Sequence, residues 1–175
     1  MMQTMIIIIL VAILVLNWVI SVKRRMEELE ENAKNTMCQI GIQLSSCFDA
    51  FIKLSDFVEK YTGFEVNQRI EIRLVRGNVI DTKSTSEDVM KQEKVISAGL
   101  NCITRIAEEN PELESSKDYV KGMDALTNFK GMVHISHLIY NDTVTRLNRE
   151  IRRFPMSIIA SFFGISERKC IEEEE

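Results

Sequence analysis

The stretch MIIIILVAILVLNWVISV, residues 5–22, decides how the rest of the chain is placed. It holds no charged residue, and a helix rising ~1.5 Å per residue crosses a hydrocarbon core of ~30 Å in about this length. Because a helix satisfies its own backbone hydrogen bonds, it can cross lipid without leaving amides unpaired. We therefore predict a transmembrane helix over residues 5–22, preceded by a short tail, residues 1–4.

The charges around this run distinguish a membrane anchor from a cleaved signal peptide. A signal peptide carries positive charge before its apolar run and small residues after it. Here Lys23, Arg24 and Arg25 follow the run, residues 1–4 contain no Lys or Arg, and no A-x-A site is present. Basic residues favour the cytoplasmic side, so we expect a single-pass protein of the cell membrane with its N-terminus outside and its C-terminal part cytoplasmic. Those three residues are also expected to contact anionic headgroups of the bilayer.

Composition limits what the remaining chain can be. The sequence has 175 residues, so the part after the apolar run suffices for one domain. The net charge is −4, whereas a nucleic-acid-binding domain needs a basic excess, and no nucleic-acid partner is expected. The four cysteines lack zinc-site spacing, and although they could form two disulfides, the predicted cytoplasmic location is reducing. Cys47 lies on an apolar helix face, where core packing is its expected role.

After the basic cluster, apolar residues recur at alternating steps of three and four, which is the heptad pattern of a packed helix. The positions of this seam are Met26, Leu29, Ala33, Met37, Ile40, Leu44, Cys47, Phe51, Leu54, Val58 and Tyr61. No proline interrupts them, and Gly63 is typical of a left-handed helix C-cap. We predict one continuous helix through the membrane segment and the seam, whose soluble part is ~60 Å long at ~1.5 Å per residue.

A second helix is expected to start at about Glu65. It weakens over residues 76–86, where Gly, Asn, Ser and Thr cluster, and it resumes at Ser86. Pro111 ends it, because proline restrains the residue before it away from helical conformation.

A third long helix is expected from Ser115 or Ser116 to Phe154, with apolar residues again three and four apart. Pro155 stops it, and a short apolar segment, residues 156–165, follows. Three long helices joined by short turns pack antiparallel.

The predicted fold is therefore all-α: a transmembrane helix that continues into an antiparallel up-down-up bundle, residues 23–166, with a short fourth helix. This order of directions places Pro111 near the bilayer and residues 156–165 at the far tip. An acidic C-terminal tail covers residues 167–175, and its last part, Glu172 to Glu175, is expected to be frayed.

Several residues of this pattern resemble the LemA family of bacterial membrane-anchored helical proteins. The clearest match, at the end of the third helix, comprises Tyr140, Asn141, Asp142, Val144, Asn148, Ile151, Arg152, Phe154, Pro155, Ile158, Ile159, Ala160, Phe163 and Gly164. A second match comprises Asn32, Ile40, Gln43, Leu44, Asp49, Leu54, Val58, Tyr61 and Glu65, and a third Ala107, Glu108, Pro111 and Leu113. The resemblance implies an N-terminal membrane helix, an antiparallel four-helix bundle and no established enzymatic activity. The chain departs from the family pattern at Cys47, Ile52, Asn128, Lys130, Gly131 and His137.

His134 and His137, the only histidines, are three residues apart on the predicted third helix and could share a metal ion. A site would need ligands from another helix, and the H-E-x-x-H context is absent. One surface and one buried histidine is the favoured interpretation, and no metal or cofactor is predicted.

Lys130 and His137 both occupy seam positions and predict a polar layer inside the bundle. A buried lysine needs a carboxylate partner or a path to water. The candidate partners are Glu71, Glu93 and Asp49. Such a layer more often fixes helix register than performs catalysis.

The apolar segment after Pro155 has two interpretations, a cap on the open end of the bundle or a docking patch for a partner protein. Its residues are Phe154, Pro155, Ile158, Ile159, Phe162 and Phe163. We expect a non-enzymatic interaction platform or scaffold on the cytoplasmic membrane face, with membrane or cytosolic proteins or a second copy of the chain as partners. The alternative is a sensor or enzyme with a polar or metal site around Lys130, His134 and His137.

Overall fold

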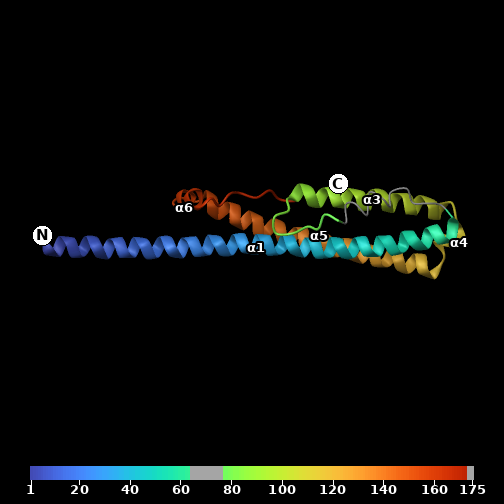
Figure 1. Cartoon of the computed structure of the whole chain (residues 1–175), viewed down its shortest axis with the longest axis horizontal. Coiled ribbons are helices and arrows are strands. Elements are labelled where there is room, and N and C mark those ends of the chain that lie inside the picture. Colours follow the sequence, from blue (N-terminus) through green and yellow to red (C-terminus); the bar gives the residue numbers. More distant parts are fainter. Residues whose placement is uncertain (64–76, 173–175) are drawn as a thin grey trace.

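The computed structural model describes residues 1–63 and 77–172, and every regular element in these two ranges is a helix (Figure 1). The helices are α1 (Met2–Thr62), α3 (Ser86–Glu108), α4 (Pro111–Glu114), α5 (Lys117–Arg152) and α6 (Met156–Phe163). The predicted all-α fold, in which an N-terminal apolar helix continues into a helical bundle, is confirmed. The start of a second helix at Glu65 lies outside the described residues.

Helix α1 is a single helix of 61 residues, without a break between the apolar run and the bundle. Its residues from Met2 to Ser21 are exposed, apart from half-buried Val19, and Val22 is the first buried position. From there the predicted seam is buried at most positions, but Leu29 is half-buried and Tyr61 is exposed. The helix ends at Gly63, whose φ of 72° is left-handed and whose N–H donates to the carbonyl of Glu59 at 2.8 Å. By length and composition α1 could cross a membrane.

Side-chain caps fix the starts of α3 and α5. Thr85 Oγ1 accepts a hydrogen bond from the N–H of Asp88, and the Thr85 N–H donates to the Asp88 carboxylate at 2.8 Å. The Thr85 hydroxyl also donates to the Asp88 carboxylate at 2.8 Å, and the hydrogen bonds from the Thr85 N–H and hydroxyl lower the pKa of Asp88, the backbone one most strongly. Ser116 caps α5 in the same manner by accepting from the N–H of Tyr119. The predicted starts are thus confirmed, while α5 ends at Arg152, shortly before the expected end.

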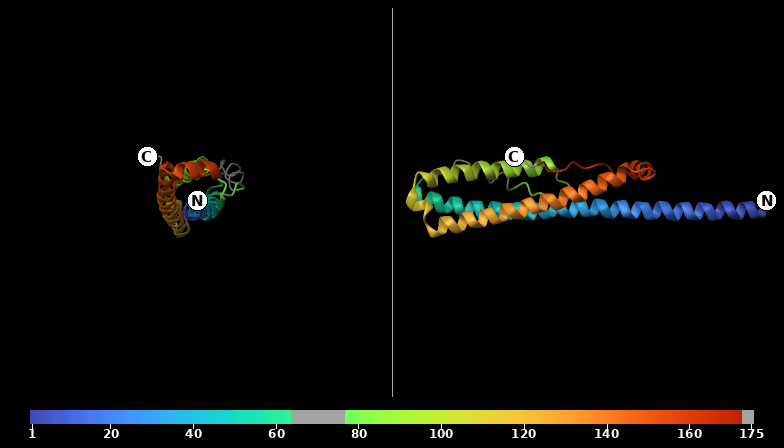
Figure 2. Two further views of the ribbon diagram at one scale, coloured as in Figure 1. Left: turned by 90° about the vertical axis from the view of Figure 1, so that its left-hand side faces the viewer. Right: turned by 180° about the vertical axis from the view of Figure 1, so that it is seen from behind.

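The order of helix directions corrects the sequence-based arrangement. We call the end of the bundle nearest the apolar run proximal and the end nearest Thr62 distal. The expected order had the second helix antiparallel and the third parallel to the first, whereas α3 runs in the same direction as α1 and α5 runs antiparallel to it (Figures 1 and 2). Ile80, shortly before α3, lies beside Gly41 in the middle of α1, whereas Glu112, shortly after α3, lies 3.4 Å from the hydroxyl of Tyr61.

Two placements predicted from the sequence are therefore reversed. Pro111 lies at the distal end rather than near the apolar run, and α6 lies at the proximal end, against Val22 and Met26 of α1. The physical reason is that Ile80, just before α3, lies beside Gly41 in the middle of α1. Helix α3 then leads away from the proximal end, and α5 returns to it.

Most of the core lies between α1 and α5 and contains the seam residues of both helices. Gly41 lets the chain before α3 cross α1 closely, because a Cβ at this position would collide with the carbonyl oxygen of Ile80. Gly122 similarly lets α5 approach α1, since a Cβ there would lie 2.8 Å from Leu54 Cδ1. Gly131 has no atom within 4 Å of such a Cβ, so close packing does not explain it.

The chain after α6 packs along the bundle up to residue 172, while residues 173–175 of the segment expected to fray lie outside the described residues. Ile171 is buried in the main core. The side chain of Asn141 binds its backbone twice: Nδ2 donates to the Ile171 carbonyl, and Oδ1 accepts from the Ile171 N–H, both at 2.8 Å. Lys169 adds an ion pair of 2.9 Å to Glu87 of α3. The tail therefore joins α5 to α3.

Candidate functional site

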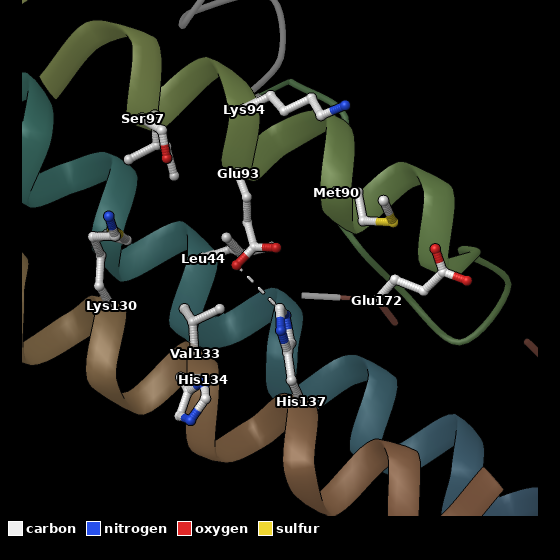
Figure 3. Close-up of a pocket in the computed structure, with 12 residues that line it drawn as sticks. Leu44, Met90, Glu93, Lys94, Ser97, Lys130, Val133, His134, His137 and Glu172 are labelled. Carbon is white, nitrogen blue, oxygen red and sulfur yellow. Dashed lines mark ion pairs between the residues drawn. The ribbon is translucent and has the colours of Figure 1, made fainter. Parts of the chain in front are cut away.

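A pocket of about 280 Å³ lies between α1, α3 and α5 near the middle of the bundle (Figure 3). Leu44 and Val133 form part of its apolar wall. On the other side, Glu93 and His137 point toward each other, with Oε1 3.6 Å from Nε2. The histidine is 4% exposed, and the Glu93 side chain is 33% exposed. The pocket thus holds a buried imidazole beside a carboxylate that reaches water.

The predicted polar layer is only partly present, because Lys130 is exposed at the rim of this pocket instead of buried with His137. Helix α3 leaves the seam of α5 open at this level, so the lysine can keep its ammonium group in water while its stem lines the pocket. Of its proposed partners, Glu93 lies against His137, and Glu71 lies outside the described residues. A buried lysine that locks helix register is therefore not what the structure contains.

The two histidines are placed differently, although they are three residues apart. His134 is exposed, and His137 is buried. Within residues 1–63 and 77–172, no three His, Cys, Asp or Glu side chains are grouped so that they could hold a metal ion. What this pocket can do chemically is hold a small polar ligand beside the paired Glu93 carboxylate and His137 imidazole.

Cys47 lines the same pocket and is 1% exposed. Burial raises the pKa of its thiol to about 11, the charge of nearby Lys130 opposes this increase, and Glu93 adds to it. The thiol is therefore protonated at neutral pH and unsuited to act as a nucleophile. Its surroundings agree with the expected role in packing.

The second candidate region is the proximal end, where α6 and the end of α5 surround α1. Ala160 packs with Val22 and Met26 of α1 in a small apolar cluster, to which half-buried Met156 and Ile159 contribute. Other predicted cap or dock residues face solvent, and Pro155 is half-buried. The exposed ones are Phe154 (82%), Ile158 (62%), Phe162 (83%) and Phe163 (40%). Helix α6 thus presents both an inner, capping face and an outer, exposed one.

Basic side chains from two helices meet at this end. Lys23 lies with its Nζ 4.9 Å from the centre of the Phe163 ring, in a cation–π contact. Glu150 of α5 is buried, and its Oε1 lies 3.8 Å from Arg25 and 3.4 Å from Arg153. Arg24, also exposed, continues the cluster on α1. The predicted headgroup-contact residues are thus joined by arginines of α5 that sequence reasoning did not select.

A sequence model of the LemA family matches residues 36–175. The chain belongs to the LemA family. The match begins within α1, so the apolar run and the basic cluster lie before it. A comparison with curated proteins finds no match.

Two of the residues that carried the resemblance, Asn141 and Asn148, have a clear structural task in this LemA protein. Both lie on α5 and bind the backbone of the C-terminal segment, Asn148 through Arg168. Sequence reasoning assigned them no role, because a side chain that binds a distant backbone leaves no periodic pattern.

Sequence reasoning also missed an exposed apolar stripe on α5 of this LemA protein. Its members are Met132 (44%), Ile135 (57%), Leu138 (53%) and Ile139 (51%). Their spacing of three and four residues could have indicated a second apolar face of the helix. The buried seam on the same helix has the same spacing, so the pattern alone did not distinguish the two faces. Contiguous exposed apolar side chains commonly mark contact surfaces.

Proposed function

We propose that the protein is a single-pass membrane anchor whose bundle serves as a non-enzymatic scaffold on the cytoplasmic face of the membrane. The observation that carries this proposal is the unbroken course of α1, from the exposed apolar run into the core of the bundle. Because one helix forms both the anchor and part of the bundle, there is no hinge at their junction. This helix holds the bundle at a fixed distance and direction from the bilayer.

The cytoplasmic orientation is supported by the charge at the proximal end. Lys23, Arg24 and Arg25 follow the apolar run, and α5 adds Arg149, Arg152 and Arg153 at the same end of the bundle. Positive residues next to a membrane helix favour the cytoplasmic side. Anionic lipids there attract each basic residue near the surface by about 1 kcal/mol.

The stripe of Met132, Ile135, Leu138 and Ile139 supports the scaffold role, because it lies on α5 between the two ends of the bundle. Apolar residues in this position face water when the protein is alone. Contact with another membrane or cytosolic protein, or with a second copy of the chain, would cover them.

Labelling of single cysteines in intact cells tests the orientation. Thr4→Cys, in a chain without the native cysteines, should react with a membrane-impermeant maleimide from outside. The exposed Cys170, retained alone, should react only after the membrane is opened. Labelling of Cys170 from outside, or a mature protein that lacks its first residues, would contradict the proposal.

A photo-crosslinking residue at position 138 tests the scaffold role in native membranes. It should give a discrete adduct, whereas the same residue in place of Lys91, which is exposed on α3, should give none. Equal or absent adducts at the two positions would count against a contact surface on α5.

The pocket at Glu93 and His137 supports a second candidate function, a sensor of a small polar ligand. Glu93→Gln and His137→Phe should then abolish the response of the cell to that ligand. Both variants should leave the crosslink from position 138 intact. A normal response in both variants would leave only the scaffold.

A further inference from the structure

Helix α6 lies at the level where the apolar run ends. Its buried residue Ala160 packs against Val22, the last residue of the run, and against Met26, one turn later. Phe163 lies beside Lys23, the first charged residue after the run. If α1 crosses the bilayer, as proposed above, these positions coincide with the headgroup layer.

The outer face of α6 is strongly apolar. Ile158 and Phe162 are four residues apart on α6, so they share one face of the helix, and Phe154 lies just before it. We call these three residues the apolar stripe; each is more than half exposed. The rings of Phe162 and Phe163 are packed edge to face at 5.3 Å. The segment from Met156 to Phe163 contains no charged residue. Capping the bundle accounts for the inner face of α6 but not for this stripe.

The direction of α6 agrees with a position on a membrane surface. Seen along α1 from its N-terminus, α6 lies across the long axis of the molecule, while α5 approaches along that axis (Figure 2). A helix that crosses the axis of a membrane-spanning helix lies in the plane of the membrane. Helices in this plane bury aromatic and aliphatic side chains at the boundary of headgroups and acyl chains.

The charges at this end match an anionic lipid surface. Arg149 and Arg152 lie in the last turn of α5, Arg153 is its C-cap immediately before Phe154, and all three are exposed. Arg152 is paired with Glu167 at 2.5 Å, which raises the pKa of its guanidinium while the carboxylate offsets part of its charge. Together with the basic residues of α1, they place positive charge next to the apolar stripe. Interfacial helices combine these two features.

We propose that α6 is a second membrane contact, which inserts Phe154, Ile158 and Phe162 into the surface of the bilayer that α1 crosses. The inference rests on the proposed crossing by α1. The contact restrains α5 at the bilayer, so the bundle is held at two points instead of one. Tilting of the bundle about α1 is then opposed by both helices.

Tryptophan fluorescence in vesicles tests this contact, because Trp18 is the only tryptophan of the chain. Full-length Phe162→Trp, in a Trp18→Phe background, would be reconstituted in phosphatidylcholine and phosphatidylglycerol vesicles with lipids brominated near the headgroup. We expect a blue-shifted emission that the brominated lipids quench. The matched control is Leu138→Trp in the same background, whose exposed position on α5 should give a red emission without quenching. Circular dichroism of each variant checks that the helices are intact.

The outcomes separate the two proposals. Quenching of native Trp18 without quenching of the indole at position 162 overturns the α6 contact and leaves the anchor unaffected. Absence of quenching at position 18 overturns the anchor, and the α6 contact with it. A shielded indole at position 162 in native membranes, but not in pure lipid, would assign the stripe to a partner protein and also overturn the inference. Loss of quenching on omission of phosphatidylglycerol is expected from the arginines.

Discussion

Asn148 of α5 makes two hydrogen bonds with the backbone of Arg168. Its Nδ2 donates to the Arg168 carbonyl at 2.8 Å, and its Oδ1 accepts from the Arg168 N–H at 3.0 Å. Asn141 repeats this arrangement with Ile171, seven residues earlier on α5 and three residues later in the tail. The tail therefore runs along one face of α5 in the direction opposite to the helix. An amide side chain suits this task because it is a donor and an acceptor at once.

Asn148→Ala should release the tail locally. The variant leaves a half-buried N–H and carbonyl of Arg168 without partners, so we expect the free energy of unfolding to fall by about 1 to 2 kcal/mol. Hydrogen exchange of residues 165–172 should accelerate more than that of α3. Asn128→Ala is the control, since Asn128 is exposed on the same helix, and it should change the stability by less than ~0.5 kcal/mol. Unchanged exchange in the tail of Asn148→Ala would contradict the clamp.

Substitutions of two helix glycines should have opposite effects. Gly131→Ala meets no atom within 4 Å, so the better helix propensity of alanine should raise the free energy of unfolding by about 1 kcal/mol. Gly41→Ala gains the same propensity, but its methyl group would collide with the backbone of Ile80, and it should lower the stability by about 1 to 3 kcal/mol. Thermal and denaturant unfolding measure both variants. Equal changes of the same sign would disprove the close approach at Gly41.

The buried thiol of Cys47 should make the stability depend on pH in the alkaline range. Its pKa is raised from 9.0 to about 11 in the folded protein, so the neutral thiol favours folding. That contribution is complete below pH 9 and is lost as the pH rises from 9 to 11, because the unfolded chain ionises first; its size is on the order of 2 kcal/mol. Cys47→Ala should show a flatter decline over this interval, whereas Cys170→Ala, which removes an exposed thiol, should keep the wild-type slope. Identical slopes in all three proteins would exclude the effect.

The long-range order of the bundle was predictable where one periodic pattern determined it. The seam from Met26 to Val58 predicted both the single helix and its buried face, and Gly63 predicted its end. The direction of α3 was not predictable in this way, since an amphipathic helix can pack against α1 in either direction. The contacts of Ile80 with Gly41 and of Glu112 with Tyr61 show this direction, and a glycine that faces away from the seam does not indicate which segment crosses it.

The candidate sites also contain features that the periodic pattern predicted and features that it could not predict. The seam predicted burial of His137 but also of Lys130, and the periodicity could not indicate that α3 leaves the lysine exposed to water. The apolar character of α6 was evident, but its place followed from the direction of α5 and was therefore reversed. A role for the arginines at the end of α5 could be inferred only from the structure, which places them beside the basic residues of α1.

Helix α6 provides the last prediction, because its two faces should respond differently to mutation. Ala160 is 1% exposed between Val22 and Met26, so Ala160→Leu would overpack this cluster and should lower the free energy of unfolding by about 1 to 3 kcal/mol in detergent. Phe162→Ser changes a side chain that is 83% exposed and should alter the stability by less than ~0.5 kcal/mol under the same conditions. Thermal unfolding of the two variants beside the wild type measures this difference. If Phe162→Ser lost as much stability as Ala160→Leu, the outer face would be part of the cap, and α6 would have no free apolar surface to offer the membrane.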